Sequence, residues 1–110
     1  MILQIFGVNK CQETRKALRF FKERRIQVDY RDLNIKGISK GELEKILKVY
    51  ELTDLIDIKG KEYEKRNLKF INHDIKSELL EDPLLFKTPI VRLKEKFTIG
   101  YQPDKWKEWF

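Results

Sequence analysis

Cysteine, histidine, glycine and proline are all scarce in this 110-residue sequence, which contains one Cys, one His, five Gly and three Pro. A single cysteine cannot form a disulfide within the chain, so a disulfide scaffold is excluded. A zinc cluster typically takes about four Cys, His or carboxylate ligands, and we therefore expect no metal site. The low glycine and proline content argues against a linker-rich or low-complexity protein.

Long apolar runs are absent as well. No stretch approaches the roughly 18 apolar residues of a membrane span, and Met1–Gln4 lacks the basic and apolar regions of a signal peptide. Hydrophobic residues make up 41% of the sequence, enough for one core. The length fits one domain, on a prior of about 100–200 residues. We expect a single domain over residues 1–110, located in the cytoplasm and without membrane contact.

Positive charge is concentrated in one segment. The formal net charge is +6, and residues 10–25 contain seven Lys and Arg against two Glu. The other 17 basic and 16 acidic residues nearly cancel. This distribution argues against direct DNA binding. The positive segment also contains the only cysteine, Cys11.

The first third of the sequence predicts a strand, a helix and a second strand. Ile2–Phe6 is a short β-type run that ends at Gly7, and Ile26–Tyr30 alternates apolar and polar residues. Between them, apolar residues recur at helical spacing from about Gln12 to Arg24. Such a βαβ unit predicts parallel strands joined by a right-handed crossover.

The middle of the sequence predicts helices. Ser39–Glu42 matches a capping box and is followed by apolar residues at helical spacing. After a linker at 54–60 we expect a helix around residues 63–68. A further helix is capped by Asn72 and ends before Pro83.

The last third predicts a hairpin and a final helix. Ile90–Leu93 and Phe97–Gly100 flank the charged residues 94–96 and are typical of antiparallel strands. Pro103 fits the first turn of the helix. Its aromatic residues are expected to pack on the sheet; they are Trp106, Trp109 and Phe110. The order βαβ, helical insertion, ββα predicts an α/β fold with a central mixed four-stranded sheet.

Cys11 lies where the first strand and its loop meet the predicted helix. The free amides of a helix's first turn and its dipole favour a thiolate, which lowers a thiol pKa from about 8.5. Basic neighbours add positive charge, and Thr14 can donate its hydroxyl to the sulfur. The alternative is a buried cysteine that serves as a small apolar residue. The residues alone leave both interpretations open.

The sequence as a whole resembles the arsenate reductase (ArsC)/Spx family. Gly7–Leu18 resembles the first loop and helix of that family, with its redox cysteine. Ile58–Tyr63 resembles the segment before the third helix. Later matches follow in the same order at Asp82–Leu85, Thr88–Val91 and Thr98–Tyr101. The resemblance covers essentially the whole chain and implies a thioredoxin-like fold with a helical insertion.

The resemblance implies roles for three residues. Cys11 matches the redox cysteine, and Pro89 matches the proline that follows a cis peptide bond and faces that cysteine in thioredoxin-like folds. The residues alone also allow a trans proline that begins an edge strand. Thr14 stands where the Spx type carries a second cysteine, so an external thiol must resolve an intermediate on Cys11. Glutathione or a glutaredoxin is the expected reductant, with no bound cofactor.

The arginines that hold an oxyanion in the reductases are not matched. Thr88 stands where an arginine precedes the proline, Lys59 is the cation available before the third helix, and the third position falls near Tyr101. Arg15 and Arg92 remain as candidate anion contacts, since arginine suits bidentate binding of an oxyanion. These departures argue against arsenate as the substrate.

Two hypotheses of function follow from the resemblance. The first is a thiol-dependent oxidoreductase with Cys11 as a monothiol nucleophile. The second is an Spx-like regulator or adaptor that binds RNA polymerase rather than DNA and has no catalytic activity. Residues 50–60 lie roughly where that partner surface falls, although an interhelical linker is the simpler interpretation. A third hypothesis is a family member that keeps the fold but has lost the catalytic activity. His73 is interpreted as a solvated residue at a helix start.

Overall fold

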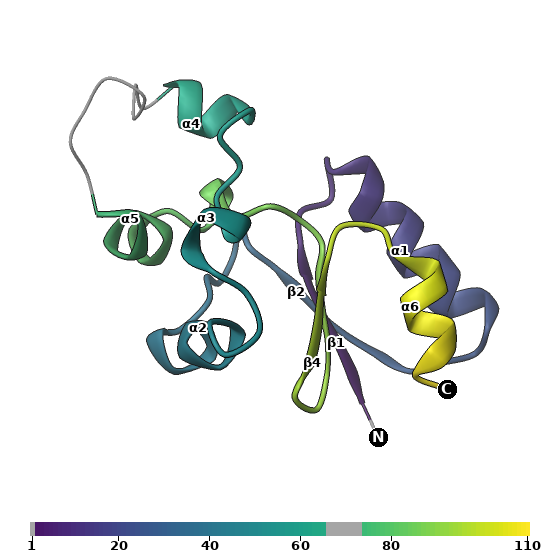
Figure 1. The fold of residues 1–110 in the computed structure, drawn as a ribbon. Coiled ribbons are helices and arrows are strands. Elements are labelled where there is room, and N and C mark those ends of the chain that lie inside the picture. The colour runs from purple at the N-terminus through teal and green to yellow at the C-terminus, as the bar shows by residue number, and fades with distance from the viewer. Residues whose placement is uncertain (1, 66–73) are drawn as a thin grey trace.

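The computed structural model describes residues 2–65 and 74–110, and its centre is a four-stranded sheet in the order β2-β1-β3-β4 (Figure 1). Strand β1 pairs parallel with β2 and antiparallel with β3, which pairs antiparallel with β4. The predicted mixed four-stranded sheet is therefore confirmed. The strands are β1 (Leu3–Gly7), β2 (Val28–Asp32), β3 (Ile90–Leu93) and β4 (Lys96–Ile99).

Helices cover both faces of this sheet (Figure 1). Helices α1 and α6 pack on one face, and the helical insertion between β2 and β3 packs on the other. The helices are α1 (Gln12–Glu23), α2 (Lys40–Ile46), α3 (Leu52–Leu55), α4 (Lys61–Lys65), α5 (Ile75–Glu81), the 3₁₀ turn η2 (Pro83–Leu85) and α6 (Pro103–Glu108). This arrangement is the predicted thioredoxin-like order of elements.

Strand β1 separates two apolar cores. Successive side chains of a strand point to opposite faces, so Leu3 and Ile5 join the core beneath α1 and α6. Phe6 joins the core of the helical insertion instead. All three side chains are buried. The sequence of β1 is almost continuously apolar because both of its faces are covered.

Trp106 anchors α6 to the sheet. Its side chain is fully buried, and its indole Nε1 donates a hydrogen bond of 2.7 Å to Thr98 Oγ1. The rings of Phe20 and Phe21 lie 5.3 and 4.9 Å from it between centroids. Phe110 is 59% exposed, but its ring still lies 6.4 Å from that of Phe21 between centroids, in an edge-to-face arrangement. Helix α6 ends at Glu108, so Phe110 lies beyond the helix at the margin of this aromatic cluster.

The capping box predicted before α2 is present. Ser39 Oγ accepts a hydrogen bond from the Glu42 amide at 3.1 Å, and Glu42 Oε1 accepts one from the Ser39 amide at 2.9 Å. Glu42 also forms a salt bridge with Arg31 of β2. Burial raises the pKa of the Glu42 carboxyl, but the hydrogen bonds from Arg31 and Ser39 outweigh it and lower the pKa below its usual value.

Two predicted boundaries are shifted. Strand β2 begins two residues later than expected, because Arg25 adopts a left-handed φ of 57° and the Ile26 amide still bonds to Phe21 O at the end of α1. Strand β4 begins at Lys96, directly paired with Leu93, so the hairpin turn is shorter than predicted.

The helical insertion also differs from the prediction. Residues 52–55 of the expected linker region form the one-turn helix α3, whose Glu51 amide donates to Asp54 Oδ2 at 3.0 Å. The N-cap of α5 is Asp74. The predicted cap Asn72, the expected helix beyond residue 65 and His73 lie outside the described residues.

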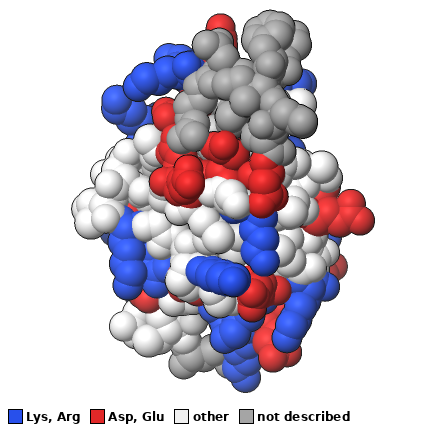
Figure 2. Space-filling view, turned by 90° about the vertical axis from the view of Figure 1, so that its left-hand side faces the viewer, with Lys and Arg blue, Asp and Glu red and all other residues white. Residues whose placement is uncertain are grey.

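Charge is unevenly divided between the two halves of the molecule. The described part of the helical insertion, residues 39–65 and 74–86, contains seven Lys and Arg against eleven Asp and Glu, whereas residues 1–38 and 87–110 carry a balance of +8. On the face shown in Figure 2, Asp and Glu side chains form a group bordered by Lys and Arg. Within the described ranges, no helix is both long enough and apolar enough to cross a membrane.

We predict that Thr98→Val lowers the free energy of unfolding by about 1–3 kcal/mol, because it leaves the buried indole N–H of Trp106 without an acceptor. Urea denaturation measures the change. When Trp106→Phe is already present, adding Thr98→Val should lower the free energy of unfolding by a smaller amount than it does in the wild type, since the indole donor is then absent. Strictly additive effects of the two substitutions would contradict the role given to this hydrogen bond.

Candidate functional site: the thiol at the start of helix α1

Cys11 is the N-cap residue of α1 and lies just beyond the end of the central strand β1. Its backbone is extended, with φ −75° and ψ 119°, and its amide donates to Val8 O at 3.0 Å. Its carbonyl accepts the first bond of the helix, from the Arg15 amide at 3.1 Å. The loop is held from β2, because Tyr30 donates its hydroxyl to Asn9 Oδ1 at 2.8 Å. The thiol is half-buried.

Hydrogen-bond donors lower the pKa of this thiol. Burial raises the pKa of Cys11, but donors around the sulfur outweigh burial and hold the pKa below its usual value. These donors are the Thr14 and Thr88 side chains and the backbone amides of Thr14 and Glu13. The interpretation of Cys11 as an inert apolar residue does not fit this environment, since donors to sulfur favour the thiolate.

The hydroxyl of Thr14 has no hydrogen-bond partner among the described residues apart from its effect on the Cys11 sulfur. Its side chain is fully buried, and Oγ1 forms no hydrogen bond of ordinary geometry with any atom of the described residues. The group it acts on is the Cys11 sulfur, whose pKa it lowers. A buried hydroxyl without an acceptor costs free energy. A negative charge on the sulfur would give this hydroxyl an acceptor.

The basic residues near Cys11 in the sequence do not surround the sulfur. Arg15 is exposed, and its Nη1 lies 3.4 Å from Asn9 O. Lys16 Nζ lies 5.9 Å from the ring centroid of Tyr101. The groups that lower the pKa of Cys11 are hydroxyls and amides. The expectation that clustered positive charge would provide the setting for the thiolate is therefore wrong.

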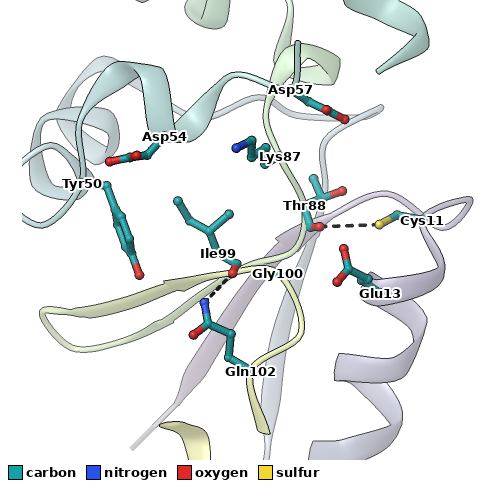
Figure 3. A pocket seen from close by; sticks show the side chains of 10 residues that line it. All are labelled: Cys11, Glu13, Tyr50, Asp54, Asp57, Lys87, Thr88, Ile99, Gly100 and Gln102. Carbon is teal, nitrogen blue, oxygen red and sulfur yellow. Dashed lines mark hydrogen bonds between the residues drawn. The ribbon is translucent and has the colours of Figure 1, made fainter. Parts of the chain in front are cut away.

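The segment before β3 faces the thiol. The Thr88–Pro89 peptide bond is cis, as the resemblance implied. Thr88 O lies 3.7 Å from Cys11 Sγ and accepts a hydrogen bond from the thiol (Figure 3). Pro89 is buried, and its carbonyl accepts the Gly100 amide at 2.8 Å. Thr14, Thr88 and Pro89 are thus brought to the region of Cys11.

A cavity of about 570 Å³ opens beside the sulfur (Figure 3). Its walls come from the start of α1, the region of α3, and the segments that precede β3 and follow β4. Three carboxylates and one lysine line it. The lining residues are Cys11, Glu13, Tyr50, Asp54, Asp57, Lys87, Thr88, Ile99, Gly100 and Gln102.

The candidate anion contacts are not assembled in this cavity. Lys59 is exposed in the turn after Asp57 and lies outside the lining. Arg92 lies on β3, where its Nε donates to Lys94 O at 2.8 Å and its guanidinium lies 5.4 Å from the ring centroid of Phe97. Arg15 is also outside the lining. The candidate anion contacts Lys59, Arg15 and Arg92 are therefore not brought together at this cavity, whose charged lining among the described residues is three carboxylates and one lysine.

The sequence analysis missed the acidic wall of the cavity. Asp54 and Asp57 fall in the stretch interpreted as a linker, where no periodicity indicates side-chain direction. The spacing of Glu51 and Asp54 was the one available signal, since it forms a capping box. Among the described residues, no three Cys, His, Asp or Glu side chains are placed to hold a metal ion together.

Comparison with known proteins agrees with this geometry. The model of the ArsC family matches residues 6–109. Global transcriptional regulator Spx 2 of Oceanobacillus iheyensis is 32% identical over 109 residues, covering 94% of this chain and 80% of that protein. Arsenate reductase from Vibrio cholerae superposes with a TM-score of 0.81 at 22% identity, covering 100% of this chain and 98% of that one.

A more distant structure shows the wider fold class. Glutaredoxin from Archaeoglobus fulgidus superposes with a TM-score of 0.50 at 15% identity, covering 96% of this chain and 82% of that one. A four-stranded mixed sheet with a thiol at the start of its first helix defines a thioredoxin-like protein. The helical insertion narrows the class further, and the chain belongs to the ArsC family.

We predict that Thr14→Val raises the pKa of Cys11, because it removes a hydroxyl that favours the thiolate. The free energy of unfolding should stay unchanged or increase by at most about 1 kcal/mol, since the lost hydroxyl has no partner in the thiol state. Iodoacetamide alkylation followed against pH gives the pKa, and urea denaturation gives the stability.

In the wild type, the alkylation rate should rise with pH and level off with a midpoint below about 8.5. Thr14→Ser, which keeps the hydroxyl, is the matched control and should retain a midpoint below that of the valine variant. A wild-type midpoint at or above about 8.5, or the same midpoint in Thr14→Val, would contradict this account of activation.

Proposed function

We propose that this protein is a thiol-dependent oxidoreductase in which Cys11 is a monothiol nucleophile. The observation that carries the proposal is a half-buried sulfur at the N-terminus of α1, facing a cavity and surrounded by hydrogen-bond donors. An external thiol, such as glutathione or a glutaredoxin, resolves the intermediate. The chain has one cysteine, so no second thiol of the same chain is available.

The proposed reaction is thiol–disulfide exchange. The Cys11 thiolate attacks one sulfur of a substrate disulfide, a bond forms between the two, and the second substrate sulfur leaves as a thiolate. An external thiolate then attacks the substrate sulfur of the mixed disulfide and Cys11 leaves. Thr14 and the first-turn amides stabilise the Cys11 thiolate in both steps, and a lower pKa makes it a better leaving group.

The cavity argues against arsenate as the substrate. Binding of a phosphate-like oxyanion is favoured by bidentate arginine and opposed by carboxylates. Arginine is absent from the lining formed by the described residues, and Lys87 is accompanied by Glu13, Asp54 and Asp57. The proposal therefore places a sulfur compound, rather than an oxyanion, against Cys11.

We predict that a neutral disulfide, 2-hydroxyethyl disulfide, adds one half-molecule per chain and that glutathione removes it. Intact-protein mass spectrometry measures both steps, and Cys11→Ser should show neither. Because Cys11 is the only cysteine, any mass increase reports on this residue alone. The proposal fails if the wild type reacts no faster at pH 7 than a small unactivated thiol does.

A second candidate function rests on the 32% identity to a protein named as a global transcriptional regulator. In that case the chain acts through a protein partner, and RNA polymerase is the partner that the resemblance implies. We predict that purified RNA polymerase is then retained equally by immobilised wild type and Cys11→Ser. Loss of retention in the serine variant would assign binding to a mixed disulfide, and no retention by either protein would contradict the regulator.

A further inference from the structure

The cavity beside Cys11 has a local charge opposite to that of the whole protein. The chain carries a net charge of +6. Among the described residues, the charged side chains that line the cavity are Glu13, Asp54 and Asp57 and one cation, Lys87 (Figure 3). In the part of the chain that the structure describes, a ligand that enters the cavity therefore meets more negative than positive side chains along the walls it shares with Cys11.

The two aspartates are held in place by the backbone around them. Asp54 Oδ2 accepts the Glu51 amide at 3.0 Å, which fixes it in the cap of α3. The Asp57 amide donates to Leu85 O at 2.8 Å, and the Lys87 amide donates to Leu55 O at 2.7 Å. These bonds join residues 55–57 to residues 85–87 as a short bridge. The acidic wall is therefore part of the framework around the site.

Glu13 completes the acidic lining from the opposite side. It lies in the first turn of α1, next to Cys11, and its carboxylate lies close to Gly100. The cations that follow it in the sequence have other contacts, since Arg15 contacts Asn9 and Lys16 lies over Tyr101. Neither of them is among the residues that line the cavity.

The buried hydroxyl of Thr14 is a second feature of the surroundings of Cys11. It is fully buried, lacks a hydrogen-bond partner of ordinary geometry among the described residues, and acts on the sulfur that lines the cavity. A donor kept in this state is explained by a negative charge that forms on the sulfur during reaction. The cavity that the three carboxylates line is therefore the one onto which this sulfur opens.

We propose that the cavity selects thiols and disulfides that carry a positive charge close to the reacting sulfur. This inference rests on the proposed function and specifies its substrate class. An ammonium group or a basic side chain near the substrate sulfur is attracted by the carboxylates, whereas a carboxylate or sulfonate is repelled. Glutathione, which has a net negative charge, is then a slower exchange partner than a cationic thiol of similar size.

Charged thiosulfonates test this selectivity at Cys11. The thiolate attacks the sulfenyl sulfur of the reagent, the bond between the two reagent sulfurs breaks, and methanesulfinate leaves as a disulfide forms on Cys11. The trimethylammonium-ethyl and sulfonato-ethyl methanethiosulfonates differ in charge. Each rate is divided by the rate of the same reagent with 2-mercaptoethanol, and the cation-to-anion ratio is then taken.

We predict a normalised ratio of about ten at low salt, the lower end of the range for electrostatic steering. In about 1 M salt, where the Debye length is about 3 Å, the ratio should fall toward one. The net positive charge of the protein alone would give a ratio below one. The sign of the effect therefore separates the field of the cavity from the field of the whole molecule.

Three variants identify the source of the selectivity. Asp57→Asn should lower the ratio, because it removes one wall carboxylate. Lys87→Gln should raise it, because it removes the one cation of the lining. Glu108→Gln removes an exposed carboxylate from α6, outside the lining, and should leave the ratio unchanged. General loss of structure would not move the first two variants in opposite directions.

Two cationic disulfides distinguish whether the preferred compound is a small aminothiol or a basic protein segment. Faster exchange with cystamine than with the disulfide of a Lys-Cys-Lys peptide indicates a small aminothiol, and the reverse indicates a basic protein segment. Either result supports the proposal if oxidised glutathione is slower than both. A wild-type ratio of one or less, or equal ratios in Asp57→Asn and Glu108→Gln, overturns the proposal.

The proposed function has its own readout in this experiment. Methyl methanethiosulfonate is neutral, so its rate reports the activation of Cys11 without the charge effect. If the wild type reacts with this neutral reagent faster than 2-mercaptoethanol does but shows a cation-to-anion ratio of one, the proposed charge selectivity is wrong. The proposed function is not contradicted by that result. Failure of the neutral reagent to react faster than with 2-mercaptoethanol would overturn both.

Discussion

The contact between Thr14 and Gly7 sets the geometry on which the site depends. A Cβ atom on Gly7 would lie 2.6 Å from both Cγ2 and Oγ1 of Thr14, so a larger residue would displace the first turn of α1. Gly7 ends the central strand, whose faces are buried, and its carbonyl accepts the Leu33 amide at 2.9 Å. The strand end therefore cannot shift, and Cys11 takes its position from this contact.

Reactivity and selectivity come from different parts of the fold. The thiolate is favoured by the Thr14 and Thr88 hydroxyls and by amides at the start of α1. The charge that a ligand meets comes largely from Asp54 and Asp57 of the helical insertion. Hydrogen bonds at a half-buried sulfur are little screened by salt, whereas interactions with exposed carboxylates are screened. Changes in the insertion can therefore alter the choice of ligand without altering the chemistry of the thiol.

The sequence predicted the elements that depend on local patterns and missed features that depend on side-chain direction. Apolar periodicity located the strands and α1, and the spacing of Ser39 and Glu42 located α2. Positive charge near Cys11 in the sequence was misleading because Arg15 contacts Asn9 and Lys16 contacts Tyr101, while the groups that lower the pKa of Cys11 are hydroxyls and backbone amides. The acidic wall arises from pairing between residues 55–57 and 85–87, a contact that no local pattern indicates.

The division of charge between the two halves makes the molecule an electric dipole. The described part of the helical insertion carries a balance of −4 and residues 1–38 and 87–110 carry +8. The insertion lies on one face of the sheet, with α1 and α6 on the other (Figure 1). A charged partner is turned by this dipole before contact, so that its approach is directed rather than random. The docking orientation is thus selected during diffusion, before any atom of the partner reaches the sulfur.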